Sequence, residues 1–407
     1  MATALCVLFP IRTTQRESMR IASRKVDHGD GLGGRASQGG SWSASAASTA
    51  QAEFRLRLSG SCLANHNGMR FQSAKKPEVS VLLPFRDAQQ TLTECMDSIL
   101  GQSFANFEVL AVNDHAGDGS EDCIRACRDS RIRLLNNPGR GLVAALNVGL
   151  RQANSNLVAR MDADDVMYPQ RLEKQTHYLR THPGLDLLAS RVEKFPQQLI
   201  QTGYREYMRW QNACVSAQTI ADEIYIESPF AHPSVMFRRD RVMQLGGYRA
   251  GRFPEDYELW LRMFHAGCCM EKLPEVLLGW RESAHRLSRT APEYERSAFD
   301  FIRAEYLARD PRIRNRPLAY WGAGRKTRKR ARLLINKGYP PLRWIDIDPK
   351  KIGRELEGVR VEAPVWLDRR ERPFVLNYVT NHGARATVRD MLDAIGYRLG
   401  RDYLEVG

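Results

Sequence analysis

The sequence has no long apolar run. Over its 407 residues no stretch approaches 18 uninterrupted apolar residues, which argues against a membrane-spanning helix. The eight cysteines show no paired metal-ligand spacing, and several fall on apolar faces of predicted helices, so we expect a reducing, cytoplasmic compartment. With 43% hydrophobic and 27% charged residues, the composition is otherwise typical of a globular protein of two or three domains.

Acidic residues are scarce near the N-terminus. The first 76 residues hold 11 Lys and Arg against 4 Asp and Glu, and so carry half of the net charge of +14. Because this segment is rich in Ser, Ala, Gly and Arg and has almost no apolar periodicity, we expect residues 1–76 to be a disordered basic extension. An organelle transit peptide has a similar composition, and Met69 is an alternative start. The residues leave these interpretations open.

Three aspartates follow a short apolar segment. Residues 157–161 suit a buried strand, and Asp162, Asp164 and Asp165 come directly after it. Carboxylates this close would repel one another unless a cation lay between them. Mg²⁺ and Mn²⁺ prefer carboxylate and phosphate oxygens, so the cluster predicts a metal site for a nucleotide diphosphate. A polar turn after a strand is the simpler alternative.

Strands and helices alternate around this cluster. The pattern predicts strands at 79–84, 107–112 and 132–135, and helices at 91–100, 120–129 and from 142 onward, with Thr91 and Ser120 as helix caps. Such alternation favours an α/β fold with a mostly parallel sheet and helices on both faces. Ligands of these sheets bind beyond the carboxyl ends of the strands, where Pro84, Asp87 and Asp114 also lie.

Three ordered blocks carry a family resemblance. Residues 79–87, 98–114 and 161–172 resemble the nucleotide-binding half of a family-2 inverting glycosyltransferase with the GT-A fold. The resemblance implies that Pro84 and Asp87 border the nucleoside and that Asp114 accepts a hydrogen bond from the uracil ring. It also implies that Asp164 lies near the ribose and Asp165 on the metal. The family usually has two acids at Asn113-Asp114 and a Tyr-Asn at Phe85-Arg86-Asp87, so base and sugar preference stay open.

An acidic pair opens a later helix. Glu255 and Asp256 follow Pro254, where the helix dipole favours negative charge and would keep a carboxylate ionised. These acids could simply stabilise the helix start, but the resemblance implies that Asp256 is the general base, with Glu255 beside it. It also implies that Arg262 holds the pyrophosphate. Trp260 could be core or site, and His232 structural or on the acceptor side. Residues 232–237 predict a strand.

A second alternating unit follows a helical linker at 291–316. Gly322-Ala-Gly324, a helix and a strand ending in aspartate are typical of a Rossmann-like half, but Thr327 replaces the third glycine and leaves dinucleotide binding open. Six of the eight residues from Arg325 to Arg332 are basic, as on a solvated helix face or a surface for an anionic membrane or acceptor. We therefore expect a GT-A domain at 77–290 and a Rossmann-like domain at 317–407, similar to the appendage of some family-2 members.

The predicted activity is sugar transfer. We expect Mn²⁺ or Mg²⁺ as cofactor, a UDP-sugar as donor and the hydroxyl of a glycan or lipid-linked saccharide as acceptor, with the protein cytoplasmic or at a membrane surface. A nucleotidyltransferase could use the same aspartates, but residues 84–90 are not the basic glycine-rich loop that it needs. A nucleic-acid binder would fit the net charge, but the excess lies in one arm and one helix without interleaved aromatics, so no nucleic-acid partner is expected.

Overall fold

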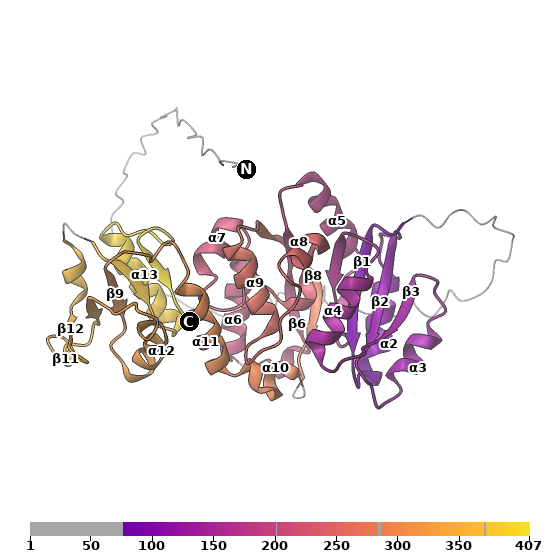
Figure 1. Cartoon of the computed structure of the whole chain (residues 1–407), viewed down its shortest axis with the longest axis horizontal. Coiled ribbons are helices and arrows are strands. Elements are labelled where there is room, and N and C mark those ends of the chain that lie inside the picture. Colours follow the sequence, from indigo (N-terminus) through magenta and orange to yellow (C-terminus); the bar gives the residue numbers. More distant parts are fainter. Residues whose placement is uncertain (1–75, 201, 284–285, 370–371) are drawn as a thin grey trace, which may run out of the picture. The chain divides into compact units, whose positions relative to one another are not determined.

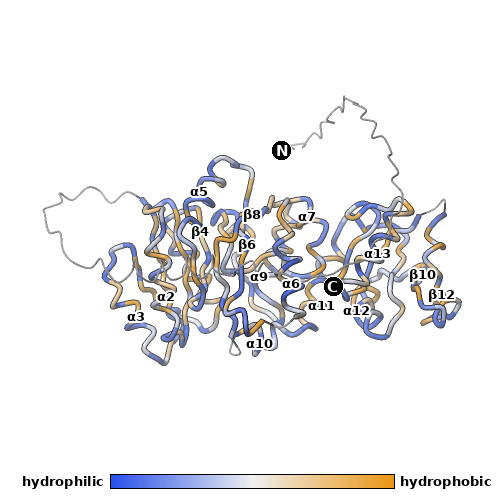
Figure 2. Tube along the Cα trace, turned by 180° about the vertical axis from the view of Figure 1, so that it is seen from behind, coloured by the Kyte–Doolittle hydropathy of each residue, from blue (hydrophilic) through white to orange (hydrophobic). Residues whose placement is uncertain are grey.

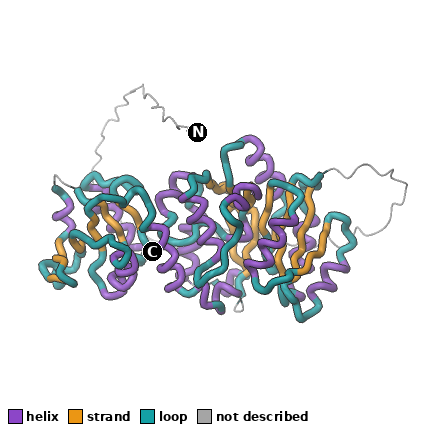
Figure 3. Tube along the Cα trace, viewed as in Figure 1, coloured by secondary structure: helices purple, strands orange, loops and turns teal. Residues whose placement is uncertain are grey.

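The computed structural model describes residues 76–407, except 201, 284–285 and 370–371. The extension predicted over residues 1–76 lies outside the described residues, apart from Lys76. The strands of the described part form two sheets, which Figure 3 shows as two separate groups of strands.

The first sheet has eight strands in the order β3-β2-β1-β4-β7-β6-β8-β5. Strands β3, β2, β1 and β4 are parallel neighbours, and β6 is parallel to β8. Strand β7 is antiparallel to both β4 and β6, and β5 is antiparallel to β8. The strands are β1 Val79–Phe85, β2 Phe107–Asn113, β3 Ile132–Asn136, β4 Leu157–Arg160, β5 Val166–Met167, β6 Leu187–Phe195, β7 Met236–Arg238 and β8 Met270–Arg281.

Helices cover both faces of this sheet, which explains why β1 is apolar at almost every position. Helix α4 lies beside β1 (Figure 1). Leu82 shares a core cluster with residues of α4, whereas its neighbours Val81 and Leu83 share another cluster with residues of α2. Gly149 lets α4 approach β1 closely, because a Cβ there would overlap Leu82. The helices before the second sheet are α2 Gln89–Leu100, α3 Ser120–Ala126, α4 Leu142–Gln152, α5 Arg171–Thr181, α6 Thr202–Ala213, α7 Ala217–Glu223, α8 Arg239–Gln244, α9 Glu255–His265, α10 Leu287–Thr290 and α11 Arg296–Leu307.

Three local predictions were wrong. Helix α2 begins at Gln89 rather than being capped by Thr91, whose hydroxyl instead donates to the carbonyl of Ala163 at 3.0 Å. Helix α3 begins at Ser120 and has no side-chain cap. The strand predicted at 232–237 begins with a turn of 3₁₀ helix, η2 His232–Ser234, because Pro233 has no N–H for a sheet ladder. The other 3₁₀ turns are η1 Gln197–Leu199, η3 Pro292–Tyr294 and η4 Pro364–Leu367.

The second sheet is smaller and has the order β11-β12-β10-β9-β13-β14. Five of its strands, β12, β10, β9, β13 and β14, are parallel to their neighbours, as the Rossmann-like prediction requires. Figure 2 shows that the strands of the sheets carry many of the hydrophobic residues. The elements are β9 Leu318–Trp321, α12 Arg325–Ile335, β10 Arg343–Ile345, β11 Glu355–Leu356, β12 Val359–Glu362, β13 Phe374–Asn377, α13 His382–Ala394 and β14 Tyr403–Glu405.

The described residues, from 76 to 407, belong to one compact unit. Helix α11, within the predicted linker, packs against both α9 and α12. The guanidinium of Arg389 binds the carboxylate of Glu223 at 3.1 Å, which ties the second sheet's helix to α7. The domain boundaries predicted at 290 and 317 therefore stay a prediction, while the α/β fold class with two sheets is confirmed. Among the helices described here, none is long and apolar enough to cross a membrane.

Candidate active site

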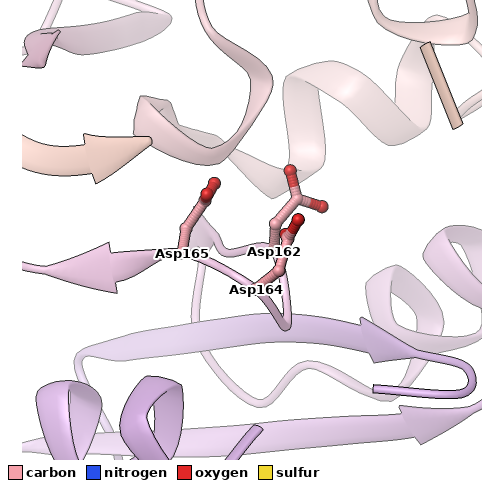
Figure 4. A group of neighbouring side chains, drawn as sticks. All are labelled: Asp162, Asp164 and Asp165. Atoms are coloured by element: carbon pink, nitrogen blue, oxygen red, sulfur yellow. The ribbon is translucent and has the colours of Figure 1, made fainter. Parts of the chain in front are cut away.

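The aspartate loop lies at the carboxyl end of β4. The chain stays beside β1 after the strand ends, because the N–H of Met161 donates to the carbonyl of Leu82 at 3.0 Å. One carboxylate oxygen from each of Asp162, Asp164 and Asp165 lies within 4.8 Å of the others. Figure 4 shows the three side chains pointing to the same side of the loop. The cluster predicted from the sequence is therefore assembled by the fold.

The three carboxylates fit a hard divalent cation. Asp165 is 1% exposed, and its Oδ1 accepts from the backbone N–H of Arg281 at 2.7 Å. Its buried Oδ2 has no hydrogen-bond partner among the described residues. Burial, followed by the charges of Asp164 and Asp162, raises the pKa of Asp165 well above its usual range. A bound Mg²⁺ or Mn²⁺ would give the orphaned oxygen a partner and relieve this repulsion.

Arginines surround the loop. Arg160 is 2% exposed and forms an ion pair with Asp162, while its Nε has no hydrogen-bond partner in the described part of the chain. The Nε of Arg281 donates to the carbonyl of Asp164 at 2.6 Å. Arg286, itself largely buried, has its pKa raised despite that burial, with the charge of Asp165 the largest opposing cause. These cations hold the loop together and provide positive charge for an anionic ligand.

A cavity of about 360 Å³ joins this loop to the start of α9. Asp162 and Asp164 line it from one strand end, and Glu255 and Asp256 line it from the helix. Arg160 and His232 also line it. The fold thus brings together two acidic pairs that are about ninety residues apart in the sequence.

The two acids at the start of α9 have different surroundings. Glu255 accepts a hydrogen bond from the hydroxyl of Tyr294 at 2.5 Å, and the Nδ1 atom of His232 lies 3.5 Å from its other oxygen. Despite burial, these contacts keep the pKa of Glu255 below its usual value. Among the residues that the structure describes, the carboxylate of Asp256 has one hydrogen-bond partner, the N–H of Tyr257 at 2.7 Å. Asp256 is therefore the less engaged of the two carboxyls.

The electrostatics of Asp256 correct one expectation. The helix dipole was expected to keep this carboxylate ionised. Burial, followed by the charge of Glu255, instead raises the pKa of Asp256 to about 8. Two adjacent carboxyls whose pKa values are moved apart are a common arrangement for acid–base chemistry. His232, whose Nε2 lies 2.8 Å from the hydroxyl of Tyr248, positions Glu255 from the other side.

The residues expected at the nucleoside lie on the neighbouring strand ends. Strand β1 runs between β2 and β4, so Pro84, Asp87 and Asp114 share one edge of the sheet with the aspartate loop. An Oδ1 of Asp114 accepts from the amide of Asn137 at 2.7 Å and from the N–H of Gly141 at 2.9 Å. Asp87 has φ +48° and accepts from a backbone N–H at 2.7 Å. These three residues do not line the cavity itself.

Arg262 is not brought to the cavity. It is 7% exposed, and its guanidinium binds the carboxylate of Glu258 at 2.7 Å and the carbonyls of Leu245 and Gly247 at 2.6 and 2.8 Å. Each guanidinium nitrogen is engaged by the protein, which favours a structural role for Arg262, and its contact with the pyrophosphate stays a prediction. Trp260 is fully buried and belongs to the core.

Sequence reasoning missed the cavity residues of β8 and of the segment after it. Trp280, Glu282 and Arg286 line the cavity, together with Lys194 of β6. The sequence of residues 270–281 contains a signal for this strand, because apolar residues alternate loosely with polar ones up to Trp280. The interruption at Pro274 and the bulge in the β6–β8 register hide this strand from a simple alternation pattern.

In the second sheet, the turn at Gly322 to Gly324 is bound by an aspartate of the same chain, Asp346. The Oδ2 of Asp346 accepts from the N–H of Ala323 at 2.9 Å and from the Nζ of Lys351 at 3.1 Å. Gly322 has φ +108°, and Thr327 packs against it in the place of a third glycine. One oxygen of Asp346 is thus bound by the chain's own donors, while dinucleotide binding by this sheet stays open.

Comparison with known proteins decides the family. A sequence profile of glycosyl transferase family 2 matches residues 80–246. The chain is 31% identical over 225 residues to EpsE of Bacillus subtilis, which covers 54% of this chain and 78% of the relative. The chain belongs to glycosyl transferase family 2. The predicted family and the predicted enzyme class, a glycosyltransferase, are confirmed.

Two further relatives of the transferase carry informative names. It is 29% identical over 230 residues to the amylovoran biosynthesis glycosyltransferase AmsE of Erwinia amylovora, covering 56% of this chain and 82% of the relative. It is also 29% identical over 245 residues to an Escherichia coli UDP-Gal:α-D-GlcNAc-diphosphoundecaprenol β-1,3-galactosyltransferase, covering 57% of this chain and 86% of that protein. The profile match at residues 80–246 lies within the region of the first sheet, Val79 to Arg281.

Proposed function

We propose that this chain is a metal-dependent, inverting transferase that moves a hexose or N-acetylhexosamine from a UDP-sugar to a hydroxyl of a glycan or lipid-linked saccharide. The observation that carries the proposal is that Asp162, Asp164 and Asp256 line one cavity. A site for the diphosphate and a candidate base thus face the same space. This arrangement suits a displacement at the sugar carbon between them.

The residues divide the reaction between them. The acceptor oxygen forms a bond to the anomeric carbon as the bond from that carbon to the UDP oxygen breaks, and the acceptor proton passes to the carboxylate of Asp256. Asp162, Asp164 and Asp165 would hold the cation, which when bound neutralises charge on the departing diphosphate. Arg160 and Arg286 add positive charge at the same place.

The nucleoside is assigned to the adjacent strand ends. Asp114 has a free lone-pair direction beyond its two protein donors and is the proposed acceptor for the uracil ring N–H. Pro84 and Asp87 would border the base and ribose, with Asp164 on the ribose side of the metal. The order uracil, ribose, diphosphate and sugar then follows the sheet edge from β2 to β4 and into the cavity.

The relatives suggest the substrates to try first. Two Escherichia coli relatives are named for UDP-Gal and UDP-Glc as donors and for GlcNAc-diphosphoundecaprenol as acceptor. We therefore propose a UDP-hexose or UDP-N-acetylhexosamine donor and a lipid-linked saccharide acceptor for this chain.

A lipid-linked acceptor would place the enzyme at a membrane surface, and we propose peripheral association there. Arg325, Lys326 and Lys329 of α12 are exposed and have no ion pair among the described residues. Such a basic helix face suits anionic lipid headgroups. Flotation with phosphatidylglycerol vesicles should recover the wild-type chain at low salt and fail for a variant with all three cations changed to Gln; equal flotation of both would contradict the proposal.

The central test of donor and metal uses UDP release. The purified full chain is incubated with UDP-Gal, UDP-Glc and UDP-GlcNAc in Mn²⁺, in Mg²⁺ and in EDTA, and released UDP is measured. We expect slow metal-dependent hydrolysis of at least one donor. Release that persists unchanged in EDTA would contradict the metal site, and release from no donor, with no UDP binding, would contradict the donor class.

A further inference from the structure

Aromatic rings form the part of the cavity wall that the proposed reaction does not use. Tyr204 and Tyr207 come from α6, and Trp280 lies at the end of β8. The ring centroids of Tyr204 and Tyr207 are 5.4 Å apart at a steep angle, and those of Tyr204 and Trp280 are 6.2 Å apart. These rings belong to the segment between β6 and η2 and to β8, and not to the strand ends assigned to the nucleoside.

This aromatic wall is held in place by its neighbours. The hydroxyl of Tyr207 donates to the carbonyl of Ser228 at 3.2 Å and accepts from the amide of Gln211 at 2.7 Å. The Nζ of Lys194 lies 3.6 Å from the ring centre of Tyr204 and 4.5 Å from that of Trp280. The rings are therefore fixed before any ligand arrives, which lowers the entropy cost of binding on them.

Glu227 is the acid in this wall that the protein leaves without a partner. It lines the cavity, and no hydrogen bond or ion pair to its carboxyl is recorded within residues 76–407 as described. Glu282, another acid of the same cavity, is by contrast paired with both Lys194 and Arg289. Arg303, a nearby cation, is engaged by Asp300 and by the carbonyl of Ile226.

Glu227 is partly buried, and its carboxyl lines the cavity. Burial raises the pKa of Glu227, although nearby arginines, Arg303 first, oppose the shift. Because the carboxyl of Glu227 lines the cavity, a ligand there can donate a hydrogen bond to it without displacing a protein partner. Aromatic faces beside one carboxylate match a pyranose ring, which offers apolar C–H groups on its faces and hydroxyls at its edge.

We propose that Glu227 and the aromatic wall of Tyr204, Tyr207 and Trp280 form the acceptor subsite, in which Glu227 accepts a hydrogen bond from a hydroxyl of the acceptor pyranose. The inference rests on the proposed transferase function and names the part of the acceptor that the enzyme recognises. Bound there, a second hydroxyl of the same ring reaches Asp256, which lines the same cavity. Glu227 thus selects which hydroxyl faces the base.

The test measures saccharide binding to the full chain by saturation-transfer NMR, with UDP and Mg²⁺ present. The probes are the methyl glycosides of GlcNAc, GalNAc, glucose and galactose. Glu227→Gln keeps the size of the side chain and removes its charge, and Glu227→Asp keeps the charge and shortens the reach. Glu206→Gln, an exposed acid on α6 outside the cavity, is the matched control. Melting temperatures confirm that each variant is folded, and calorimetry gives the UDP affinity.

We expect at least one glycoside to bind the wild type, and Glu227→Gln to weaken it by about 10-fold or more, as for loss of a charge-assisted hydrogen bond. The glycoside affinity of Glu227→Asp should lie between those of wild type and Glu227→Gln, and that of the control variant should match wild type. All four proteins should bind UDP with the same affinity. Equal glycoside binding by wild type and Glu227→Gln, or binding of no glycoside while UDP binds, overturns the subsite. If the wild-type chain does not bind UDP, the proposed donor is overturned, whether or not a glycoside binds.

Discussion

The pH dependence of turnover tests the pairing of Glu255 with Asp256. Only ionised Asp256 can take the acceptor proton, and burial with the neighbouring charge of Glu255 raises its pKa to about 8. At pH 7 only about one tenth of the enzyme would then hold an ionised base, so kcat/KM should rise about tenfold between pH 7 and the plateau above pH 8. Because the folded pKa is raised, the active form is lost as the pH falls.

Replacing Glu255 isolates the cause. Glu255→Gln removes the largest charge that opposes ionisation of Asp256, so the rising limb should move to lower pH and the ratio of rates at pH 9 and pH 7 should shrink. Using this ratio separates the pKa effect from any uniform loss of activity. Profiles are measured with Mg²⁺ from pH 6 to 9, with Glu206→Gln as the control. If the rate rises over the same pH range in Glu255→Gln and in wild type, the electrostatic coupling between the two carboxyls is refuted.

Two further substitutions separate metal binding from structure. Asp165→Asn should weaken metal-dependent UDP binding by tenfold or more, about 1.4 kcal/mol, measured by calorimetry with and without Mg²⁺; equal affinity in both proteins would exclude Asp165 as a ligand. Arg262→Met should cost about 3–5 kcal/mol of unfolding free energy in urea, because it removes the close ion pair of the buried Glu258 and leaves only the longer contact with Arg249, at 3.7 Å. The folded fraction of Arg262→Met should keep wild-type UDP affinity, whereas a selective loss of that affinity would restore the pyrophosphate role.

The nucleotide half of the fold could be predicted because its strands are buried on both faces. Continuous apolar runs ending in polar residues identify β1, β2 and β4, and parallel pairing then places their carboxyl ends together. The aspartate cluster followed from the same reasoning. The hydrogen bond from the hydroxyl of Thr91 in α2 to the carbonyl of Ala163 in the aspartate loop could not be predicted, because Thr91 has the sequence pattern of a helix cap.

The acceptor half was harder to predict. Helices α6 and α7 carry aromatic and charged residues that serve the cavity and the second sheet, which blurs the usual amphipathic pattern. The position of Arg262 in the sequence suggests a ligand contact, but its guanidinium donates to the carbonyls of Leu245 and Gly247, which only the folded chain brings near. The raised pKa of Asp256 likewise depends on burial, in a cavity whose lining comes from segments distant in the sequence, such as the one holding Tyr294.

The most direct measurement of the central claim is turnover by Asp256→Asn. As the base, Asp256 acts on the acceptor in the transition state, so the substitution should cut turnover by about 10²–10⁴-fold while UDP-sugar affinity and melting temperature stay near wild type. As a helix-start acid alone it would contribute only about 0.3–1 kcal/mol to stability, and turnover would hardly change. A loss of turnover with intact donor binding is the predicted result; near-normal turnover would contradict the assignment and point to Glu255 as the base.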